Sequence, residues 1–267
     1  MEGPSYLGAL QAFAACQPAV RILPLEADGL DPGALREELV SQKPPLLYTT
    51  PSFQNPSGGT MSAAKRDALA AMAAVGEVVI IEDDPYGELR YEGEDPGLIR
   101  ERSDRVILLG SFSKIVAPGL RLGWVLAPPA VREKLLVLKQ AADLHSAGIA
   151  QHILLEYLKH NDLDAHIEGL RNMYRLRRDA MLRALEREFG DRVSFVRPEG
   201  GMFLWCRLPV AATDQLFEAA LARDVLFVPG SCFFPDRLSS AAKSYARLNF
   251  SAVSETQIQT GMGRLAE

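Results

Sequence analysis

Short apolar runs alternate with longer amphipathic stretches through the first half of the chain. Each run ends at a glycine, a proline or a group of polar residues, as buried strands commonly do. The runs predict strands over residues 19–25, 46–49, 78–81, 106–109 and 123–126. Apolar residues at helical spacing predict helices over residues 32–41 and 62–74, with Ser62 as the N-cap of the second and Gly76 just past its end.

Fully apolar strands that alternate with helices are typical of a mainly parallel sheet covered on both faces. The sequence therefore predicts an α/β fold. Ligands of such sheets bind beyond the carboxyl ends of the strands. Asn55, Asp83 and residues 111–114 each come just after a predicted strand. Their convergence on one crevice follows from this topology.

Long helices replace the alternating pattern after about Asp143. Helical spacing predicts one helix over residues 147–159 and a longer one over residues 163–189. The apolar stripe of the longer helix consists of Ile167, Leu170, Tyr174, Met181 and Leu185. Three arginines are expected off this stripe, namely Arg171, Arg175 and Arg178.

The C-terminal part of the chain is predicted to form a second compact unit. It contains predicted strands over residues 193–196, 201–208, 226–228 and 245–250 and a predicted helix over residues 215–222. We place the boundary inside the long helix, at Tyr174. Residues 1–173 then form a large domain, and residues 174–267 form a smaller α/β domain.

Composition excludes several classes of protein. A hydrophobic fraction of 48% and a charged fraction of 24% are those of a soluble globular protein, and the net charge of −5 argues against binding to nucleic acid. Cys16, Cys206 and Cys232 are too few and too scattered for a disulfide framework or a zinc site, which favours free thiols in the cytoplasm. The four histidines have no accompanying carboxylate cluster, so no metal site is expected. No apolar run approaches the roughly 20 residues that span a membrane, and the first residues do not resemble a signal peptide.

The most distinctive stretch of the sequence runs from Leu108 to Trp124. An apolar strand stops at Gly110, and two serines, a lysine and an arginine follow within a dozen residues, namely Ser111, Ser113, Lys114 and Arg121. The serine hydroxyls can donate to an anion, and a planar guanidinium can clamp it. An anion held beside a lysine suggests a phosphorylated cofactor with an aldehyde, and pyridoxal 5'-phosphate fits this pair.

This stretch resembles the lysine loop of fold-type I pyridoxal-phosphate enzymes, specifically class I and II aminotransferases. Three further motifs occur in the order of that family: Pro51-Ser-Phe-Gln-Asn-Pro-Ser-Gly-Gly59, Ile80-Ile-Glu-Asp-Asp-Pro-Tyr86 and Ala246-Arg-Leu-Asn-Phe-Ser251. Together the four motifs span nearly the whole chain. Within the family, the segments PSYLGALQAF, PSFQNPSGG, QAADLH and GGMF are most similar to those of the 2-aminoadipate and kynurenine aminotransferase branch.

The resemblance implies a role for each matching residue. Lys114 would bond to the cofactor aldehyde and act as the general base at the substrate's alpha carbon. Asp83 would face the pyridine nitrogen, and Tyr86 and Asn55 would hydrogen-bond the phenolic oxygen. Tyr6 would stack on the pyridine ring. The phosphate would rest on Ser111, Ser113 and Arg121, and Arg247, with Asn55, would hold the substrate carboxylate.

Residue types alone leave alternatives open for several of these positions. Asn55 before a proline also fits an ordinary turn, and Asp83 fits a strand-end turn or cap. Tyr6 fits equally well as a loop aromatic in the core. An arginine in an apolar strand needs a partner, so a structural salt bridge is the main rival role for Arg247.

The function implied is transamination between an amino acid and a 2-oxo acid such as 2-oxoglutarate. Candidate donors are 2-aminoadipate, aromatic and branched-chain amino acids, and the family resemblance implies a homodimer. The family's N-terminal arm, first strands and phosphate-binding glycine/serine loop have no counterpart here. The large domain is therefore expected to be N-terminally incomplete and this chain to be weak or inactive.

A pyridoxal-phosphate-sensing effector domain of a MocR-like regulator, of the GntR family, is the alternative from another class. Asn55 favours the enzyme, because those regulators often carry a bulky aromatic residue there. A beta-lyase of the same fold type would use the same lysine and aspartate.

Overall fold

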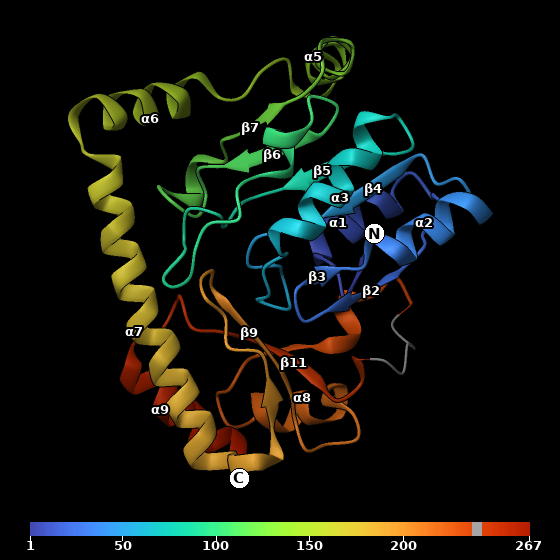
Figure 1. Cartoon of the computed structure of the whole chain (residues 1–267). Helices are drawn as coiled ribbons and strands as arrows, with labels where there is room; N and C mark the ends of the chain where they lie inside the picture. The colour runs from blue at the N-terminus through green and yellow to red at the C-terminus, as the bar shows by residue number, and fades with distance from the viewer. Residues whose placement is uncertain (237–241) are drawn as a thin grey trace.

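The computed structural model describes residues 1–236 and 242–267, whose strands form three sheets (Figure 1). The central sheet has the order β4-β5-β6-β7, with β4 at Leu46–Thr49, β5 at Val79–Asp83, β6 at Ile107–Ser111 and β7 at Gly123–Leu126. β4, β5 and β6 are parallel to one another, and β7 is antiparallel to β6. The α/β class and the mainly parallel sheet predicted from the sequence are thus present.

Helices connect the parallel strands. α3 (Ala63–Ala74) lies between β4 and β5 in the chain, and the short α4 (Ile99–Arg102) lies between β5 and β6. Leu69 of α3 packs with Leu47 and Ile80 in a fully buried apolar cluster. Ser62 occupies the N-cap of α3 as predicted, but its side chain makes no capping hydrogen bond. Gly76 has φ +80°, the left-handed conformation that ends many helices.

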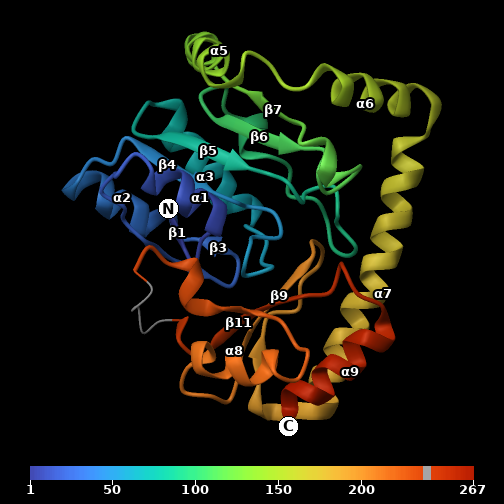
Figure 2. The same ribbon diagram turned by 180° about the vertical axis from the view of Figure 1, so that it is seen from behind.

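The start of the chain forms a small sheet beside the central one. β2 (Leu23–Glu26) pairs with β1 (Glu2–Gly3) and with β3 (Gly29–Leu30). The strand predicted over residues 19–25 is therefore shorter and begins later than expected. Two helices flank it, α1 (Leu7–Ala14) and α2 (Pro32–Ser41), and Figure 2 shows both beside β1 and β3.

The far edge of the central sheet is open to solvent. All four residues of β7 are exposed, including Trp124. α5 (Pro129–Asp143) follows β7 and contains no buried residue. Burial in the central sheet is therefore concentrated on β4, β5 and the start of β6.

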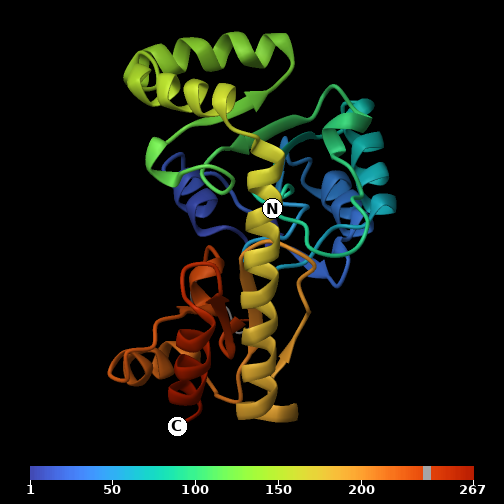
Figure 3. The same ribbon diagram turned by 90° about the vertical axis from the view of Figure 1, so that its left-hand side faces the viewer.

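α7 (Leu163–Phe189) follows α6 (Gly148–His160), and Figure 3 shows it running from just below α5 and α6 to the lower end of the molecule. Beside its lower half lies an antiparallel sheet of order β10-β11-β9-β8. Its strands are β8 (Ser194–Phe195), β9 (Phe203–Arg207), β10 (Val228–Pro229) and β11 (Tyr245–Asn249), and the helices α8 (Thr213–Leu221) and α9 (Glu255–Ala266) complete this part. Short 3₁₀ turns lie at Pro118–Leu120, Gly190–Arg192 and Gly230–Phe233.

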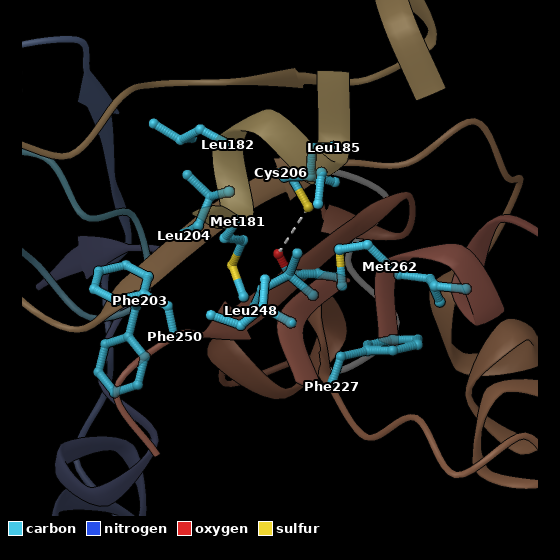
Figure 4. Packing of buried hydrophobic residues seen from close by; sticks show 14 of the residues in the cluster. Met181, Leu182, Leu185, Phe203, Leu204, Cys206, Phe227, Leu248, Phe250 and Met262 are labelled. Atoms are coloured by element: carbon cyan, nitrogen blue, oxygen red, sulfur yellow. Dashed lines mark hydrogen bonds between the residues drawn. The ribbon is translucent and has the colours of Figure 1, made fainter. Parts of the chain in front are cut away.

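A second apolar core lies between α7 and this antiparallel sheet. Figure 4 shows Met181 and Leu185 of α7 close to Leu248 of β11 and Met262 of α9. The Cys206 thiol lies in the same core and contacts the Ala246 carbonyl at 3.8 Å. Phe53, Tyr86 and Leu89 belong to this core too, although they come from the first part of the chain.

No helix in the described part of the chain is long and apolar enough to cross a membrane. Within residues 1–236 and 242–267 no cluster of three or more metal-ligating side chains occurs. The three cysteines are free, as the sequence analysis expected.

Arg178 of α7 is completely buried, so its predicted place off the apolar stripe is wrong. It follows Tyr174 by four residues, and residues at this spacing share one face of a helix. Its guanidinium donates to the Pro198 carbonyl at 2.8 Å and to Glu92 at 2.7 Å, and lies 5.6 Å from the centre of the Tyr91 ring. Hydrogen bonds thus accommodate the charge where α7 meets the loop after β5.

Arg178→Met is expected to lower the free energy of unfolding by about 2–3 kcal/mol, because it leaves the Pro198 carbonyl without its donor and removes a charged hydrogen bond. The Arg178 and Arg197 hydrogen bonds hold the pKa of Glu92 down at about 2. A depressed carboxyl pKa stabilises the fold at neutral pH, and this contribution is lost as the pH falls toward 2. Urea unfolding at pH 7 and pH 3 measures both effects. Arg175→Met, an exposed change on the same helix, should have little effect; an equal loss in both variants would contradict the prediction.

Candidate active site

Three of the predicted site residues lie at the carboxyl ends of the parallel strands in the central sheet. Asn55 lies in the turn after β4, Asp83 is the last residue of β5, and Lys114 lies in the loop after β6. These strands are parallel neighbours, so their carboxyl ends lie side by side at the same end of the sheet. Arg247 comes from β11 of the other sheet and reaches the same place through Asn55.

The Lys114 amine lies in a partly buried position near other site residues. Its Nζ atom is 5.9 Å from the centre of the Tyr86 ring. Burial lowers the pKa of Lys114, and the charges of Arg247 and Arg121 lower it further. A lowered pKa increases the fraction of neutral amine, which is the form that attacks a carbonyl or accepts a proton.

Tyr86 is buried and lies at the centre of the group. Burial, with a smaller contribution from Tyr6, raises the pKa of Tyr86, while Arg247 and a hydrogen bond with Asn55 act in the opposite direction. The phenol is therefore neutral over the physiological pH range and can donate a hydrogen bond. Its ring packs edge-to-face against Phe203 of β9, with ring centres 5.9 Å apart.

Arg247 is held in place by an amide and by aromatic rings. Its Nη1 donates to Asn55 Oδ1 at 2.9 Å, and its guanidinium lies 4.2 Å from the Phe203 ring centre and 5.1 Å from that of Phe233. Its Nε is buried and has no partner. The rival role, a structural salt bridge, is not observed within residues 1–236 and 242–267.

Burial lowers the pKa of Arg247, while nearby Tyr86, Tyr6 and Cys232 act in the opposite direction. A buried guanidinium without a carboxylate partner is unfavourable. The side chain is therefore suited to bind an external carboxylate.

Asp83 makes one strong contact that the sequence analysis missed. Its Oδ2 accepts a hydrogen bond of 2.5 Å from the Tyr48 hydroxyl of β4. Burial raises the pKa of Asp83, and this hydrogen bond acts in the opposite direction. Tyr48 lies near the carboxyl end of a buried strand, and that position was the available signal.

The two acidic neighbours of Asp83 have other roles. Glu82 points away from the site, as the alternation along a strand predicts, and accepts hydrogen bonds from the backbone of Ile99 and Arg100. Asp84 accepts from the Gly87 backbone, and burial together with the Glu82 charge raises the pKa of Asp84 to about 7.

The loop around Lys114 carries the predicted phosphate ligands. The Ser113 backbone donates to Ser111 Oγ at 3.0 Å, which closes a tight turn before the lysine. Arg121 has φ +53° and an exposed side chain, with Nη1 3.4 Å from the Pro118 carbonyl. Ser111, Ser113 and Arg121 thus share one loop with Lys114, and Arg121 is close enough to affect the lysine's pKa.

Tyr6 lies just before α1 and is 40% exposed. It contributes to the pKa values of both Tyr86 and Arg247, so it lies near the site. Its ring covers Gly8, where an added Cβ would come within 2.6 Å of it. The structure thus places Tyr6 at the exposed rim of the group.

A cavity of about 1000 Å³ lies apart from these residues. It is mostly apolar and lies between the small N-terminal sheet and the antiparallel sheet, with Ile22, Phe195, Trp205 and Tyr245 in its wall. None of the predicted site residues lines it. We assign it no role in the chemistry.

The α/β fold and the meeting of a lysine, an aspartate and an arginine at the carboxyl ends of parallel strands are typical of one class of protein, the fold-type I transferases. The chain belongs to the family "Aminotransferase class I and II", whose sequence profile matches residues 1–265. It is 43% identical to aromatic-amino-acid aminotransferase 1 of Thermococcus litoralis, over 100% of this chain and 65% of that protein.

Two further relatives represent two different functions, an aminotransferase and a transcriptional regulator. The crystal structure of LysN, the alpha-aminoadipate aminotransferase of Thermus thermophilus, complexed with N-(5'-phosphopyridoxyl)-L-leucine, matches with a TM-score of 0.93 and 38% identity. That match covers 99% of this chain and 69% of the other. An uncharacterized HTH-type transcriptional regulator of Bacillus subtilis is 34% identical, over 100% of this chain and 54% of its own length. The chain therefore spans only part of the length of each of these relatives.

Proposed function

We propose that this chain is the lysine- and substrate-binding part of a pyridoxal-phosphate-dependent aminotransferase. The reaction is the transfer of an amino group from an amino acid to a 2-oxo acid such as 2-oxoglutarate. One observation carries the proposal: Lys114, Tyr86, Asn55 and Arg247 lie together at the carboxyl ends of the parallel strands. Among the described residues, no carboxylate forms an ion pair with Arg247. The family of the chain and the phosphopyridoxyl ligand of the Thermus structure support pyridoxal phosphate as the cofactor.

The residues present fit this cofactor. Lys114 supplies an amine of lowered pKa, and Asp83 supplies a carboxylate with one oxygen already held by Tyr48. Tyr86 supplies a neutral phenol beside Asn55. We assign the phosphate to Ser111, Ser113 and Arg121, and we propose that Tyr6 stacks on the pyridine ring.

When bound, the cofactor supplies an electron sink for the electrons left when the alpha carbon loses its proton. Lys114 takes that proton with its Nζ and returns it, because its lowered pKa leaves the neutral amine accessible. Asp83 keeps a proton on the pyridine nitrogen by charge pairing. Arg247 binds the substrate carboxylate, and Asn55 orients the guanidinium through the hydrogen bond at Nη1.

The donor is proposed to be an aromatic, 2-aminoadipate or branched-chain amino acid. The names of the Thermococcus and Thermus relatives support the first two classes. We also propose a homodimer in the cytoplasm. Residues 1–173 and 174–267 are proposed as two domains. Two apolar cores support this division, one around α3, β4 and β5 and one between α7 and the antiparallel sheet.

We expect this chain to convert amino acids slowly, because the phosphate ligands that we assign among its described residues are two serines and an exposed arginine. The test incubates the chain with pyridoxal phosphate, 2-oxoglutarate and each candidate donor, and follows formation of the 2-oxo acid product. We predict a rate well below about 1 s⁻¹, the lower end for ordinary enzymes. A faster rate would contradict the weak-activity part, whereas no product from any donor after long incubation would contradict transamination by this chain.

An effector domain of a pyridoxal-phosphate-sensing regulator is the second candidate. The relative of Bacillus subtilis favours it, since its similarity extends over the whole of this chain. The same assay separates the two functions. A regulator domain binds the cofactor at Lys114 but forms no 2-oxo acid from any donor.

A further inference from the structure

Tyr48 makes the contact to Asp83 from an unusually fixed position. It is the third residue of β4, is 5% exposed and pairs in register with Ile81 of β5. Its ring packs edge-to-face on Phe13 of α1, with ring centres 5.7 Å apart. Strand pairing and packing together determine where the hydroxyl lies, and the hydroxyl lies 2.5 Å from Asp83 Oδ2.

We propose that Tyr48 is a positioning residue for Asp83: it holds one carboxylate oxygen so that the other is presented to the pyridine nitrogen. This inference rests on the proposed function for the identity of the ring, but the Tyr48–Asp83 contact itself does not. A carboxylate with both oxygens free can rotate about its last bond, whereas one held at Oδ2 has a defined orientation.

The hydroxyl is a permanent donor in this position. Burial and the nearby Asp83 charge raise the pKa of Tyr48 well above its ordinary value, so the phenol keeps its proton. A hydrogen bond from a neutral donor to a carboxylate favours the ionised carboxylate. Tyr48 therefore also helps to keep Asp83 charged in a buried place where burial alone favours the neutral acid.

The groups that face Asp83 come from two elements. Tyr48 lies on β4, and Tyr86, whose pKa the Asp83 charge raises, lies in the turn after β5. Within residues 1–236 and 242–267, no Lys, Arg or His makes an ion pair with Asp83. The Tyr48 hydroxyl is thus the main group here that stabilises the charge on Asp83 in the absence of cofactor.

The first test needs no cofactor. The pKa of Asp83 is measured by carbon NMR of the chain labelled at the aspartate carboxyl carbons, with Asp83→Asn to assign the signal. In Tyr48→Phe, which keeps the ring and its packing on Phe13, we expect that pKa to rise by about one unit or more. The control is Tyr174→Phe, which changes a buried tyrosine of the apolar core beside α7 and should leave the pKa of Asp83 unchanged. An Asp83 pKa that is the same in Tyr48→Phe and in the unaltered chain would overturn the inference.

The second test uses pyridoxal phosphate and separates this inference from the proposed function. Affinity for the cofactor, followed by quenching of protein fluorescence, should fall by about tenfold or more in Tyr48→Phe and stay unchanged in Tyr174→Phe. If the unaltered chain binds no pyridoxal phosphate, the proposed function fails for this chain, and the NMR result alone decides on Tyr48. If Tyr48→Phe does not fold, the Tyr48 hydroxyl proton of the unaltered chain decides: a downfield signal lost on protonation of Asp83 supports the inference, and its persistence overturns it.

Discussion

Lys114→Ala is expected to abolish transamination, with a loss of at least about 10⁴-fold, because no other amine takes its place in the proposed site. The loss combines two functions of the same atom. In the proposed function, the Nζ atom would bond to the cofactor's aldehyde, and it would also carry the proton to and from the alpha carbon. General base catalysis alone accounts for about 10²–10⁴ of the rate. Cofactor binding should weaken without disappearing, since Asp83, Tyr86 and the loop ligands remain.

The matched control is Lys139→Ala, which removes an exposed lysine of α5 that forms an ion pair with Asp143 of the same helix. Product formation over hours gives the rate, and the absorbance of retained cofactor gives the binding. Turnover in Lys114→Ala within tenfold of the unaltered chain would exclude the assignment of the lysine. Comparable loss in both variants would show that the effect does not come from the site.

Arg66→Met is expected to lower the free energy of unfolding by about 3–5 kcal/mol, the largest stability effect that we predict. Arg66 is fully buried and donates to the carbonyls of Met61, Gly97 and Pro51. It also lies 3.7 Å from the fully buried Glu82. Methionine fills a similar volume but removes a hydrogen-bond donor from each of these carbonyls and the positive charge beside the Glu82 carboxylate.

The pH dependence of this variant has a definite sign. Burial raises the pKa of Glu82, and the Arg66 charge opposes that rise. Without Arg66 the pKa of Glu82 should rise further, so the neutral acid is favoured and ionisation destabilises the fold. The deficit relative to the unaltered chain should therefore grow as the pH increases. Urea unfolding at several pH values measures it.

Arg36→Met, an exposed change on α2, is the control and should alter stability by less than about 0.5 kcal/mol. A deficit in Arg66→Met that is small, or that shrinks as the pH rises, would contradict the role given to the buried pair. This pair links the base of the Asn55 turn, through Pro51, to the strand that ends at Asp83. A large deficit should thus be accompanied by weaker cofactor binding.

The sequence predicts best the residues that follow directly after apolar strands. Asn55, Asp83 and Lys114 lie close together because the neighbouring parallel strands before them have their carboxyl ends on the same side of the sheet. The sequence shows where each of these strands ends. Arg247 is different. It joins Asn55 across 192 positions and from another sheet, so only the family resemblance pointed to it.

Buried polar side chains were the features that the sequence analysis missed. Tyr48 resembles an ordinary strand residue, and its partner lies 35 positions away on the neighbouring strand. Arg178 lies on the buried face of α7 by spacing, but its charge suggested the opposite. The carbonyl and carboxylate that accept from it come from distant segments, and a helical pattern contains no information about them.

Helices were missed where their apolar stripe is weak or exposed. α5 carries apolar residues, among them Leu135, Leu136 and Leu138, but these are exposed and no residue of the helix is buried. α9 offered a usable signal, since Ser254 and Gln257 form a capping box, and its face packs on α7 through Ile258 and Met262. A search for capping pairs would have found it.

The most direct test of the central claim is borohydride reduction of the purified chain after incubation with pyridoxal phosphate, followed by peptide mass mapping. Borohydride converts the bond between a lysine and the aldehyde to a stable amine. We predict one pyridoxyl group, confined to Lys114, because this amine alone combines a lowered pKa with the neighbouring Tyr86, Arg121 and Arg247. No adduct, or labelling spread over surface lysines, would contradict the claim that this loop binds the cofactor.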